Sequence, residues 1–577
     1  MSTESSSNVT TGGLVSEVIE SYRYLEMETG RYLLFVVVPA IVFFVVTVIL
    51  AIQPWLPLIA RASLVMLGGM ILLSGIAYPK IERDQRRVDL ENQFHLGVTH
   101  MTVLSITNID RMEVMRKLAE EREYGEFSRE IRKIVHLVDG WNQSLDDAFR
   151  RRARAVPSEP VADFFERMAY TLNAGQGIDE FLLDEQAVML EQYETVYEST
   201  LGNLDVLKDI YLSMILAMTF ALVFAVVLPI LTGTHPTLTV AIVLVIFFFV
   251  QLGFYIAIRS MVPYDPIWFH PEDISAAGER RLQLSMVAGG GIAVLGIVVV
   301  GMSFFGVANM PSLPFGSIPL PLYIAIPLTP LVIPGVVFYI EEQRVKRRDA
   351  EFPSFIRALG SVESAKQSTT TEVLTSLRRK DFGPLTEDIN NLYKRLNMRI
   401  NNELAWRHFA ADANSFLIRR FSEMYLIARQ MGGQPKQISD LIARNMNVVN
   451  QLRERRRQST ITLIGVLYGV TAAATFAFFI GLEIVKLLAG MDLDLSGPQQ
   501  MGMDFGEIIH TEAYNVDVIE LMLYGVILFN AMISAILIRT ADGGHQANAY
   551  LHFVAMTWIA CLTAIVTTRV VSSFFAV

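Results

Sequence analysis

The residue types that carry out catalysis and metal binding are sparse and scattered along this 577-residue chain. The only cysteine, Cys561, lies in an apolar run, so neither an intramolecular disulfide nor a thiolate metal cluster can form. The nine histidines are widely spaced and include no H-E-x-x-H motif. The sequence also lacks a G-x-x-x-x-G-K-[ST] phosphate loop and a G-x-S-x-G nucleophile turn. We therefore expect no enzymatic activity, no metal and no cofactor.

Clusters of arginine are the residues whose spacing indicates binding. Clusters that adjoin an apolar segment are explained by anionic lipid or by orientation in a membrane, whereas clusters farther along the chain are candidates for contact with a protein partner. No aromatic-basic motif accompanies them, so we expect no nucleic acid. The candidate partner-binding residues are Arg150, Arg151, Arg152, Arg154, Arg378, Arg379, Lys380, Arg419, Arg420, Arg455, Arg456 and Arg457.

The composition requires that much of the chain lie in a membrane. Hydrophobic residues make up 52% of the sequence and charged residues 18%, with a mean hydropathy of +0.39. Residues 1–30 lack the basic start and short apolar core of a signal peptide, so the first apolar run is expected to be a retained span. Nine runs are long enough to cross the bilayer, at 32–52, 63–78, 210–231, 238–258, 286–305, 320–340, 460–488, 521–538 and 550–575.

The distribution of lysine and arginine predicts the orientation of these spans. Basic clusters follow the second and sixth runs, whereas the connection after the seventh run carries seven acidic residues and no basic one. One topology accounts for this distribution: the N-terminus and both large polar stretches are cytoplasmic, and the C-terminus is outside. The protein is thus expected in the cytoplasmic membrane as a multi-pass protein.

Apolar residues in both polar stretches recur at spacings of three and four, and no period-two strand is visible, so the expected fold class is all-α. Between the stretches, three prolines and two aromatic residues predict a stiff, extended connector; Trp268 and Phe269 either rest at the headgroup level or belong to a plain linker. The expected domains are an N-terminal tail and hairpin (1–79), bundle 1 (80–208), a membrane hairpin (209–258), the connector (259–285), a second membrane hairpin (286–340), bundle 2 (341–459) and three C-terminal membrane helices (460–577).

The two polar stretches contain similar residues in the same order, separated by a nearly constant number of positions, which indicates an internal duplication. Tyr124-Gly125 matches Phe382-Gly383, and the glycine turn at Gly175 recurs at Gly432. The charges of the two copies differ in sign: bundle 1 has 17 basic and 25 acidic residues, and bundle 2 has 22 basic and 14 acidic residues. Opposite charge on one fold suggests different partners for the two copies.

A transporter is a second functional class to consider, because several prolines can kink the spans. A transport pathway needs ionisable groups near the bilayer midplane, and Glu483 is the only obvious acid within a long apolar run. Since Glu483 lies late in its run, near Lys486, we expect it close to the outer interface. The large polar stretches are also hard to explain as transport machinery. A membrane signalling protein is a third class to consider, but no kinase or phosphoacceptor motif in the sequence supports it.

Two similar helical bundles, each followed by membrane helices and without a catalytic motif, resemble the type II secretion F family. These are the membrane platform proteins of type IV pilus-like machines. The segments that begin at Met112 and Thr371, and the helices around Phe165 and Phe421 with their glycine turns, carry the resemblance. Bacterial members usually have three spans. The nine expected here are closer to the archaeal branch, and most similar to the platforms of the archaeal flagellum (archaellum).

The resemblance implies a scaffold without enzymatic activity. A hexameric secretion or motor ATPase would engage the bundles, and pilin-like or archaellin subunits would be assembled by the platform, which is expected to be a homodimer surrounded by membrane lipid. An archaeal adhesion-pilus platform of the same family is the nearest alternative. Only ten of the 48 basic residues are lysine and the net charge is −10, which would suit a halophile, although ordinary compositional drift explains these values equally well.

Overall fold

The structure is a computed structural model that describes residues 32–51, 58–107, 109–232, 235–263, 265–269, 277–304, 319–367, 369–490 and 516–575. Every element of two or more residues in these ranges is helical, which confirms the predicted fold class. The chain divides into two compact units, Met1–Leu190 with Gln430–Gly433 and Glu191–Arg429 with Gln434–Val577. We describe each unit by itself.

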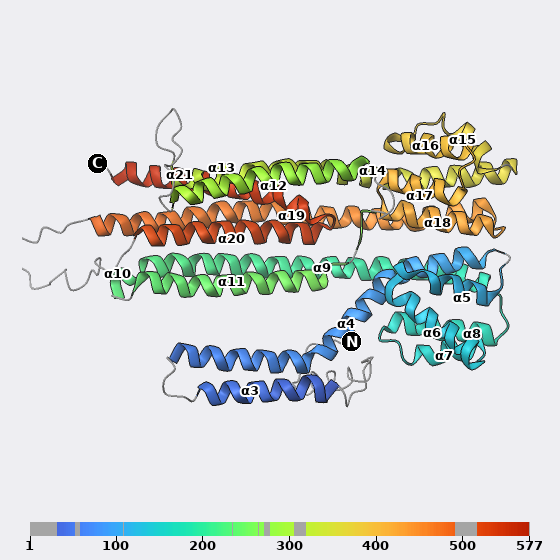
Figure 1. The fold of residues 1–577 in the computed structure, drawn as a ribbon, viewed down its shortest axis with the longest axis horizontal. Coiled ribbons are helices and arrows are strands. Elements are labelled where there is room, and N and C mark those ends of the chain that lie inside the picture. Colours follow the sequence, from blue (N-terminus) through green and yellow to red (C-terminus); the bar gives the residue numbers. More distant parts are fainter. Residues whose placement is uncertain are drawn as a thin grey trace, which may run out of the picture. The chain divides into compact units, whose positions relative to one another are not determined.

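The first unit contains an N-terminal pair of helices and bundle 1 (Figure 1). The π-helical turn η2 continues into α3, and α4 extends from the membrane-type segment into bundle 1. The helices of this unit are η2 (Leu33–Val37), α3 (Val38–Ala51), α4 (Leu58–Ser105), α5 (Arg111–Glu120), η3 (Arg122–Tyr124), α6 (Gly125–Trp141), α7 (Leu145–Ala153), α8 (Glu159–Asn173) and the start of α9 (Ile178–Val227).

Local sequence signals set the helix ends in bundle 1. The Asp110 side chain accepts a hydrogen bond from the Met112 amide (3.1 Å) and caps α5. Gly175 follows α8 with φ +74°, a left-handed conformation that glycine adopts without strain. The core combines aliphatic side chains with aromatic rings, and Phe94 of α4 contacts Phe127 of α6 (5.7 Å between ring centres). Bundle 1 therefore has a hydrophobic core of its own.

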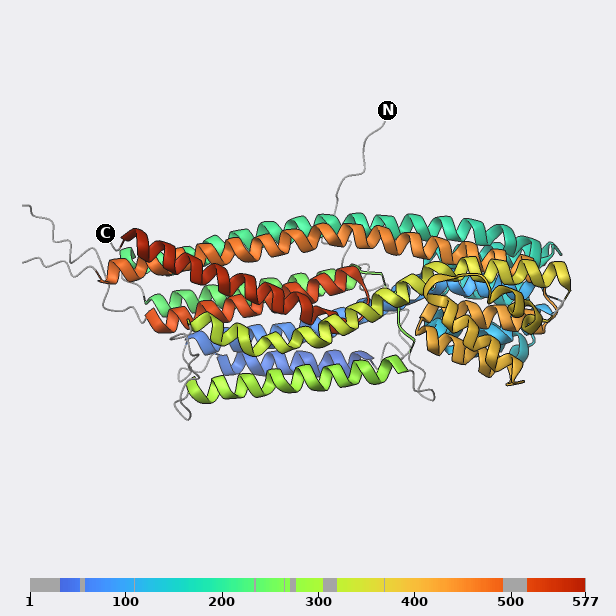
Figure 2. The ribbon, with the colours of Figure 1, turned by 90° about the horizontal axis from the view of Figure 1, so that it is seen from above.

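The second unit contains the remaining membrane-type helices and bundle 2 (Figure 2). Its longest element, α19, runs without a break from bundle 2 to the end of a span. The helices are the rest of α9, α10 (Pro229–Thr232), α11 (Pro236–Met261), α12 (Ala277–Phe304), α13 (Leu320–Leu328), η4 (Thr329–Leu331), α14 (Val332–Lys366), α15 (Thr370–Leu377), η5 (Gly383–Leu385), α16 (Thr386–Asn397), α17 (Asn402–Ala413), α18 (Phe416–Gln430), α19 (Pro435–Gly490), α20 (Val516–Asp542), η7 (Gln546–Asn548) and α21 (Ala549–Phe575).

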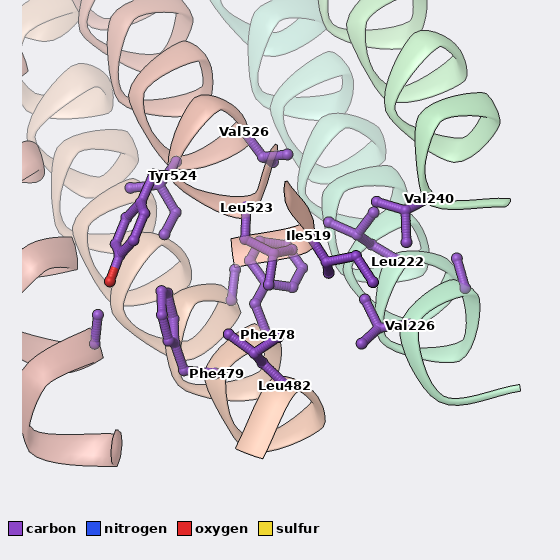
Figure 3. Packing of buried hydrophobic residues seen from close by; sticks show 14 of the residues in the cluster. Leu222, Val226, Val240, Phe478, Phe479, Leu482, Ile519, Leu523, Tyr524 and Val526 are labelled. Carbon is purple, nitrogen blue, oxygen red and sulfur yellow. The ribbon is translucent and has the colours of Figure 1, made fainter. Parts of the chain in front are cut away.

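Apolar side chains of five helices, α9, α11, α19, α20 and α21, pack together between the spans of this unit (Figure 3). Leu222 of α9, Val240 of α11, Phe478 of α19 and Leu523 of α20 are all buried in this cluster. Dispersion between close-packed side chains is the main force that holds helices together in lipid. The cluster therefore fixes α19 and α20 against α9 and α11.

Seven helices of the described ranges are long and apolar enough to cross a membrane. They correspond to the seven runs predicted from residue 210 onward. The first predicted span falls on the shorter apolar helix of Val38–Ile49, and the second lies within α4. The count of nine therefore stays a prediction. In the sixth run, Pro330 lies in the 3-10 turn η4 between α13 and α14.

The two bundles have their elements in the same order. In each, a long helix is followed by a short helix, a 3-10 turn, three further helices and a long helix that enters a span. Gly125 and Gly383, at the 3-10 turns, have φ values of +51° and +56°, and the ring before each glycine is buried. Gly175 and Gly432 also share positive φ. This correspondence supports the duplication, whose common origin remains a prediction.

Candidate functional site

Buried ion pairs lie where bundle 2 meets the spans of the second unit, and we call this set of residues the junction. Its members come from α14, α19, α20 and the connector after α11, so four separate segments meet there. The junction consists of Asp265, Glu342, Asp349, Arg453, Arg456 and Arg539.

Arg453 of α19 holds two carboxylates from different segments. Its Nε and Nη2 donate to the two oxygens of Asp265 in the connector (2.8 and 2.6 Å), and its Nη1 donates to Asp349 Oδ2 of α14 (2.7 Å). Ser415, just before α18, donates its hydroxyl to the other oxygen of Asp349. Asn450 of α19 donates to the backbone carbonyl of Asp349 (2.9 Å). The arginine therefore ties α19 to both α14 and the connector.

Arg456, one helical turn later, is bound by backbone instead of carboxylates. Its guanidinium donates to the carbonyl oxygens of Ala541 (2.7 Å), Thr540 (3.0 Å) and Pro263 (3.2 Å), and the residue is only 3% exposed. The Thr540 and Ala541 carbonyls lie in the last turn of α20 and are available because the helix ends at Asp542, after which the chain turns through Gly543 with φ +74°. A Cβ atom on Gly543 would lie 2.8 Å from Arg456 Cζ, so this position requires glycine.

Glu342 and Arg539 form the third part of the junction. Arg539 Nη2 of α20 donates to Glu342 Oε2 of α14 at 2.9 Å, and both side chains are almost fully buried. Asn548 Nδ2 also donates to this oxygen (2.6 Å), and Lys346 Nζ lies 3.0 Å from Oε1. A Cβ atom on Gly544 would lie 2.6 Å from Glu342 Oε2. The turn between α20 and α21 is therefore shaped around a buried carboxylate.

The electrostatics of the junction favour the charged form of Asp265, whereas burial raises the pKa of Asp349 to about 6. Burial opposes ionisation of Asp265, but the Arg453 guanidinium outweighs it and lowers the pKa of Asp265 below its usual value. Removing one partner of such a buried pair leaves an uncompensated charge, which typically costs about 3–5 kcal/mol. The junction thus holds α14, α19, α20 and the connector in one arrangement. No three His, Cys, Asp or Glu residues of the described ranges are placed to hold a metal ion.

The connector itself lies against bundle 2. Ile267 accepts a hydrogen bond from the Phe416 amide (3.0 Å), and Trp268 forms an isolated antiparallel bridge with Ser415. The Trp268 ring packs near Phe338 of α14 (6.3 Å between centres), and Phe269 is buried. The plain-linker alternative is therefore wrong: the two rings pack within the second unit because aromatic surface and backbone partners are available there. That they lie at the headgroup level stays a prediction.

The predicted partner-binding residues of bundle 1 lie on or just after α7. Arg151 and Arg154 are exposed, and the Arg151 guanidinium lies 6.0 Å from the centre of the Trp141 ring. Arg152 is instead bound to the buried carboxylate of Glu130 (2.6 Å). Arg150 is half-buried, 3.8 Å from Asp147. The structure therefore brings Arg150, Arg151 and Arg154 together near one surface.

The predicted residues of bundle 2 separate into exposed and buried groups. Arg378, Arg379 and Lys380 follow α15 and are exposed, and the Arg378 guanidinium lies 4.7 Å from the Tyr393 ring centre. Arg420 is only 2% exposed, and Arg419 lies on the Phe269 ring (4.4 Å). We therefore keep the 378–380 group as the candidate surface and leave Arg420 out.

The arginines at the end of bundle 2 have three different environments. Arg455 is paired with Glu198 and, at 3.3 Å, with Glu194, both on α9. Arg456 belongs to the junction, and Arg457 is 3.8 Å from Glu454. Because Arg456 is buried, we also leave it out of the candidate surface.

Sequence reasoning missed the acidic members of the junction and Arg539. Glu342 and Arg539 are 197 positions apart, and Arg453 is 188 positions from Asp265. Charged residues that directly follow an apolar run, as Glu342 and Arg539 do, were a usable signal, since such positions are either exposed to headgroups or paired in the interior. Nothing in the sequence indicates which of them pair.

Comparison with known proteins gives consistent matches. Residues 98–229 match the family described as "Type II secretion system (T2SS), protein F", which covers most of bundle 1 and the span after it. "Flagella accessory protein J" of Methanocaldococcus jannaschii is 34% identical over 95% of this chain and 96% of its own length. "Flagella accessory protein J" of Methanococcus voltae is 33% identical over 89% of this chain and 90% of its own. A shorter match, 21% identical over 25% of this chain, is to "Uncharacterized protein MJ1286" of M. jannaschii.

No solved structure matches the chain significantly. The two long matches come from methanogens, so they give no support to a halophilic source. Identity above 30% along nearly the whole of both chains, together with seven spanning-type helices, places the protein among multi-pass proteins of the cytoplasmic membrane. The chain belongs to the flagella accessory protein J family.

Proposed function

We propose that this protein is the membrane platform of an archaeal flagellum, on which filament subunits are assembled and from which the filament is turned. The observation that carries the proposal is the passage of α14 and α19 from bundle 2 directly into spans, with both helices bound together at the junction. A helix resists bending, so movement of the bundle is transferred to the spans. The whole-length similarity to "Flagella accessory protein J" supports a flagellar role.

In this proposal a hexameric secretion or motor ATPase engages the bundles from the cytoplasm. The N-terminus and both bundles then lie inside and the C-terminus outside, as the basic clusters predict. The exposed group Arg378, Arg379 and Lys380 belongs to the bundle with excess positive charge, and the group Arg150, Arg151 and Arg154 forms a basic surface on the acidic bundle. An ATPase with acidic docking residues would complement either surface.

The proposed platform has no enzymatic activity, and ATP hydrolysis belongs to its partner. Pilin-like archaellin subunits would contact the spans. The homodimer stays a prediction that rests on the family resemblance alone.

The test is charge reversal at the exposed groups, followed by co-purification of the ATPase from the membrane. We expect replacement of Arg378, Arg379 and Lys380 by Glu to reduce the bound ATPase at least about tenfold, since opposed charges then face each other. Membrane insertion and the amount of protein should not change. The same replacements at Arg150, Arg151 and Arg154 show whether bundle 1 also contributes.

A matched control replaces Arg378 and Arg379 by Lys, which keeps both charges and should keep the ATPase bound. Full co-purification in both reversed variants would contradict the docking proposal. In cells, a deletion strain should lose swimming and regain it from a plasmid copy. A deletion strain that swims but no longer adheres would instead favour the adhesion-pilus platform.

A further inference from the structure

A cavity of about 300 Å³ lies beside the junction, between α14, α19, the connector and the end of α20. A volume of this size is at the lower end of small-molecule sites. Five of the residues that line the cavity are cations: Lys346 and Arg347 of α14, and Arg453, Arg456 and Arg457 of α19. No other cavity described in the second unit combines so many positive groups.

The carboxylates in the cavity wall are largely bound by other groups. Both oxygens of Asp265 accept hydrogen bonds from Arg453. Asp542 accepts one from Arg539 (2.8 Å) and lies 3.7 Å from Lys346. Glu454 stands at 3.8 Å from Arg457 and is more than half exposed. Of the wall carboxylates, only Glu454 is left to balance further positive charge.

Two of the cations have no carboxylate partner. Within the described part of the chain, no Asp or Glu oxygen lies within 4.0 Å of a side-chain nitrogen of Arg347 or Arg456. Arg456 donates to three backbone carbonyls, which do not neutralise its charge. Arg347 is exposed at the cavity. The cavity therefore retains positive charge in a partly desolvated place, where an anion is bound most strongly.

The level of the cavity along the spans indicates the source of the anion. On α14 the cavity residues begin three positions after the apolar run ends at Ile340, and on α19 they end three positions before the run begins at Thr460. At 1.5 Å per residue the nearest cavity residues are about 5 Å from the hydrocarbon edge. The headgroup layer extends about 5–8 Å beyond that edge. Headgroup phosphates lie at this depth.

We propose that this cavity binds a phosphate group, with Arg347, Arg456 and Arg457 as its principal contacts. Guanidinium groups suit phosphate because their planar donors match two of its oxygens. The same chemistry is offered by the headgroup of an anionic phospholipid and by a dissolved phosphate ester. The depth of the cavity favours the lipid. A bound headgroup would also brace α14 against α19 beside the junction, and this inference does not depend on the proposed flagellar function.

The experiment measures thermal unfolding of the full-length protein in detergent as lipid is added. Phosphatidylglycerol is the anionic lipid, phosphatidylcholine is the neutral one, and inorganic phosphate and glycerol 3-phosphate are tested without lipid at constant ionic strength. We expect phosphatidylglycerol to raise the melting temperature by several degrees and to saturate near one lipid per chain. Phosphatidylcholine should give a much smaller shift.

The cavity variant carries Arg347→Gln and Arg457→Gln, and it should lose most of the phosphatidylglycerol shift. The matched control carries Arg344→Gln and Arg455→Gln on the same two helices. It removes the same charge but leaves the cavity intact, because neither residue lines it. The control should keep the shift. Replacement of Arg347 and Arg457 by Lys keeps both charges and should keep at least half of the shift. This result would show that the loss in the Gln variant is not a folding defect.

If glycerol 3-phosphate or inorganic phosphate raises the melting temperature of the wild type as the lipid does, but not that of the cavity variant, the phosphate site is supported with a dissolved ligand as its source. An equal phosphatidylglycerol shift in the wild type and the cavity variant would overturn the proposal. Equal loss in the cavity variant and the control would also overturn it, because the effect would then follow net charge alone.

Discussion

Glu342 and Arg539 form a buried ion pair of 2.9 Å that joins α14 to the end of α20. The two residues come from opposite ends of the second unit's sequence, and the turn that follows α20 closes over the pair through Gly544. The pair therefore connects the entry of bundle 2 to the last pair of membrane helices.

The pair should show strong energetic coupling in a double-mutant cycle. Arg539→Met leaves the buried carboxylate of Glu342 with Lys346 and Asn548, and we expect a loss of about 3–5 kcal/mol in unfolding free energy. Adding Glu342→Gln should recover part of the loss, with a coupling energy of about 1–3 kcal/mol. The measurement is unfolding of the purified protein in detergent. The exposed pair Arg344 and Glu341 on the same helix is the control and should couple by less than about 1 kcal/mol. Equal coupling in the two pairs would show that burial of Glu342 has no energetic importance.

Close packing of α14 on α19 gives a second prediction. A Cβ atom on Gly360 would lie 2.5 Å from Ser439 Cβ of α19, so Gly360→Ala must push the helices apart. We expect a loss of about 1–3 kcal/mol from this overpacking. In the control, Gly202→Ala on α9, the new methyl meets no atom within 4 Å, and the better helix propensity of alanine should add about 0.5–1 kcal/mol. Thermal unfolding of both variants checks the prediction, and a stabilised Gly360→Ala protein would contradict it.

The Asp388 carboxyl should make the stability of bundle 2 depend on pH. Burial raises the pKa of Asp388 to about 7, although the Arg348 guanidinium at 3.0 Å opposes the shift. The folded state thus holds a proton that the unfolded chain releases near the usual value of 3.8. Stability from this group is complete below pH 3.8 and is lost as the pH rises through about 7.

Asp388→Asn removes the titrating group and keeps its size. Relative to the wild type, this variant should therefore gain in melting temperature between pH 5 and pH 8. Melting curves at four pH values test the expected difference. Asp440→Asn, at the exposed ion pair with Arg357, is the control and should keep the wild-type pH dependence. A difference in melting temperature between Asp388→Asn and the wild type that is the same at all four pH values would contradict the raised pKa.

Helices and their ends were predictable because their signals are local. The Gly175 and Gly432 turns are where the sequence predicted them. Apolar runs identified the spans, but they did not show that α9 extends back to Ile178 as one helix. Polar residues continue the helix there, and hydropathy responds only to the apolar part.

The junction was not predictable because its contacts are distant in sequence. Arg453 lies in a basic cluster beside a span, and orientation in the membrane is a sufficient explanation for such clusters. Its partner Asp349 lies 104 positions away, directly after the basic residues that follow the sixth run. The sequence also did not show that Arg378 is exposed and Arg420 is buried, since each lies next to a second arginine.

The position of Arg453 within α19 has a mechanical consequence. From Pro435 to Arg453 the helix measures about 27 Å, and from Arg453 to Gly490 about 56 Å. A stiff rod that is clamped at Arg453 and Arg456 pivots about that point, with unequal arms in a ratio of about one to two. In the proposed function, a displacement of the short arm, in bundle 2, would appear at the far end of the span about twice as large and in the opposite direction. The junction would then set the ratio between movement of bundle 2 and movement of the span.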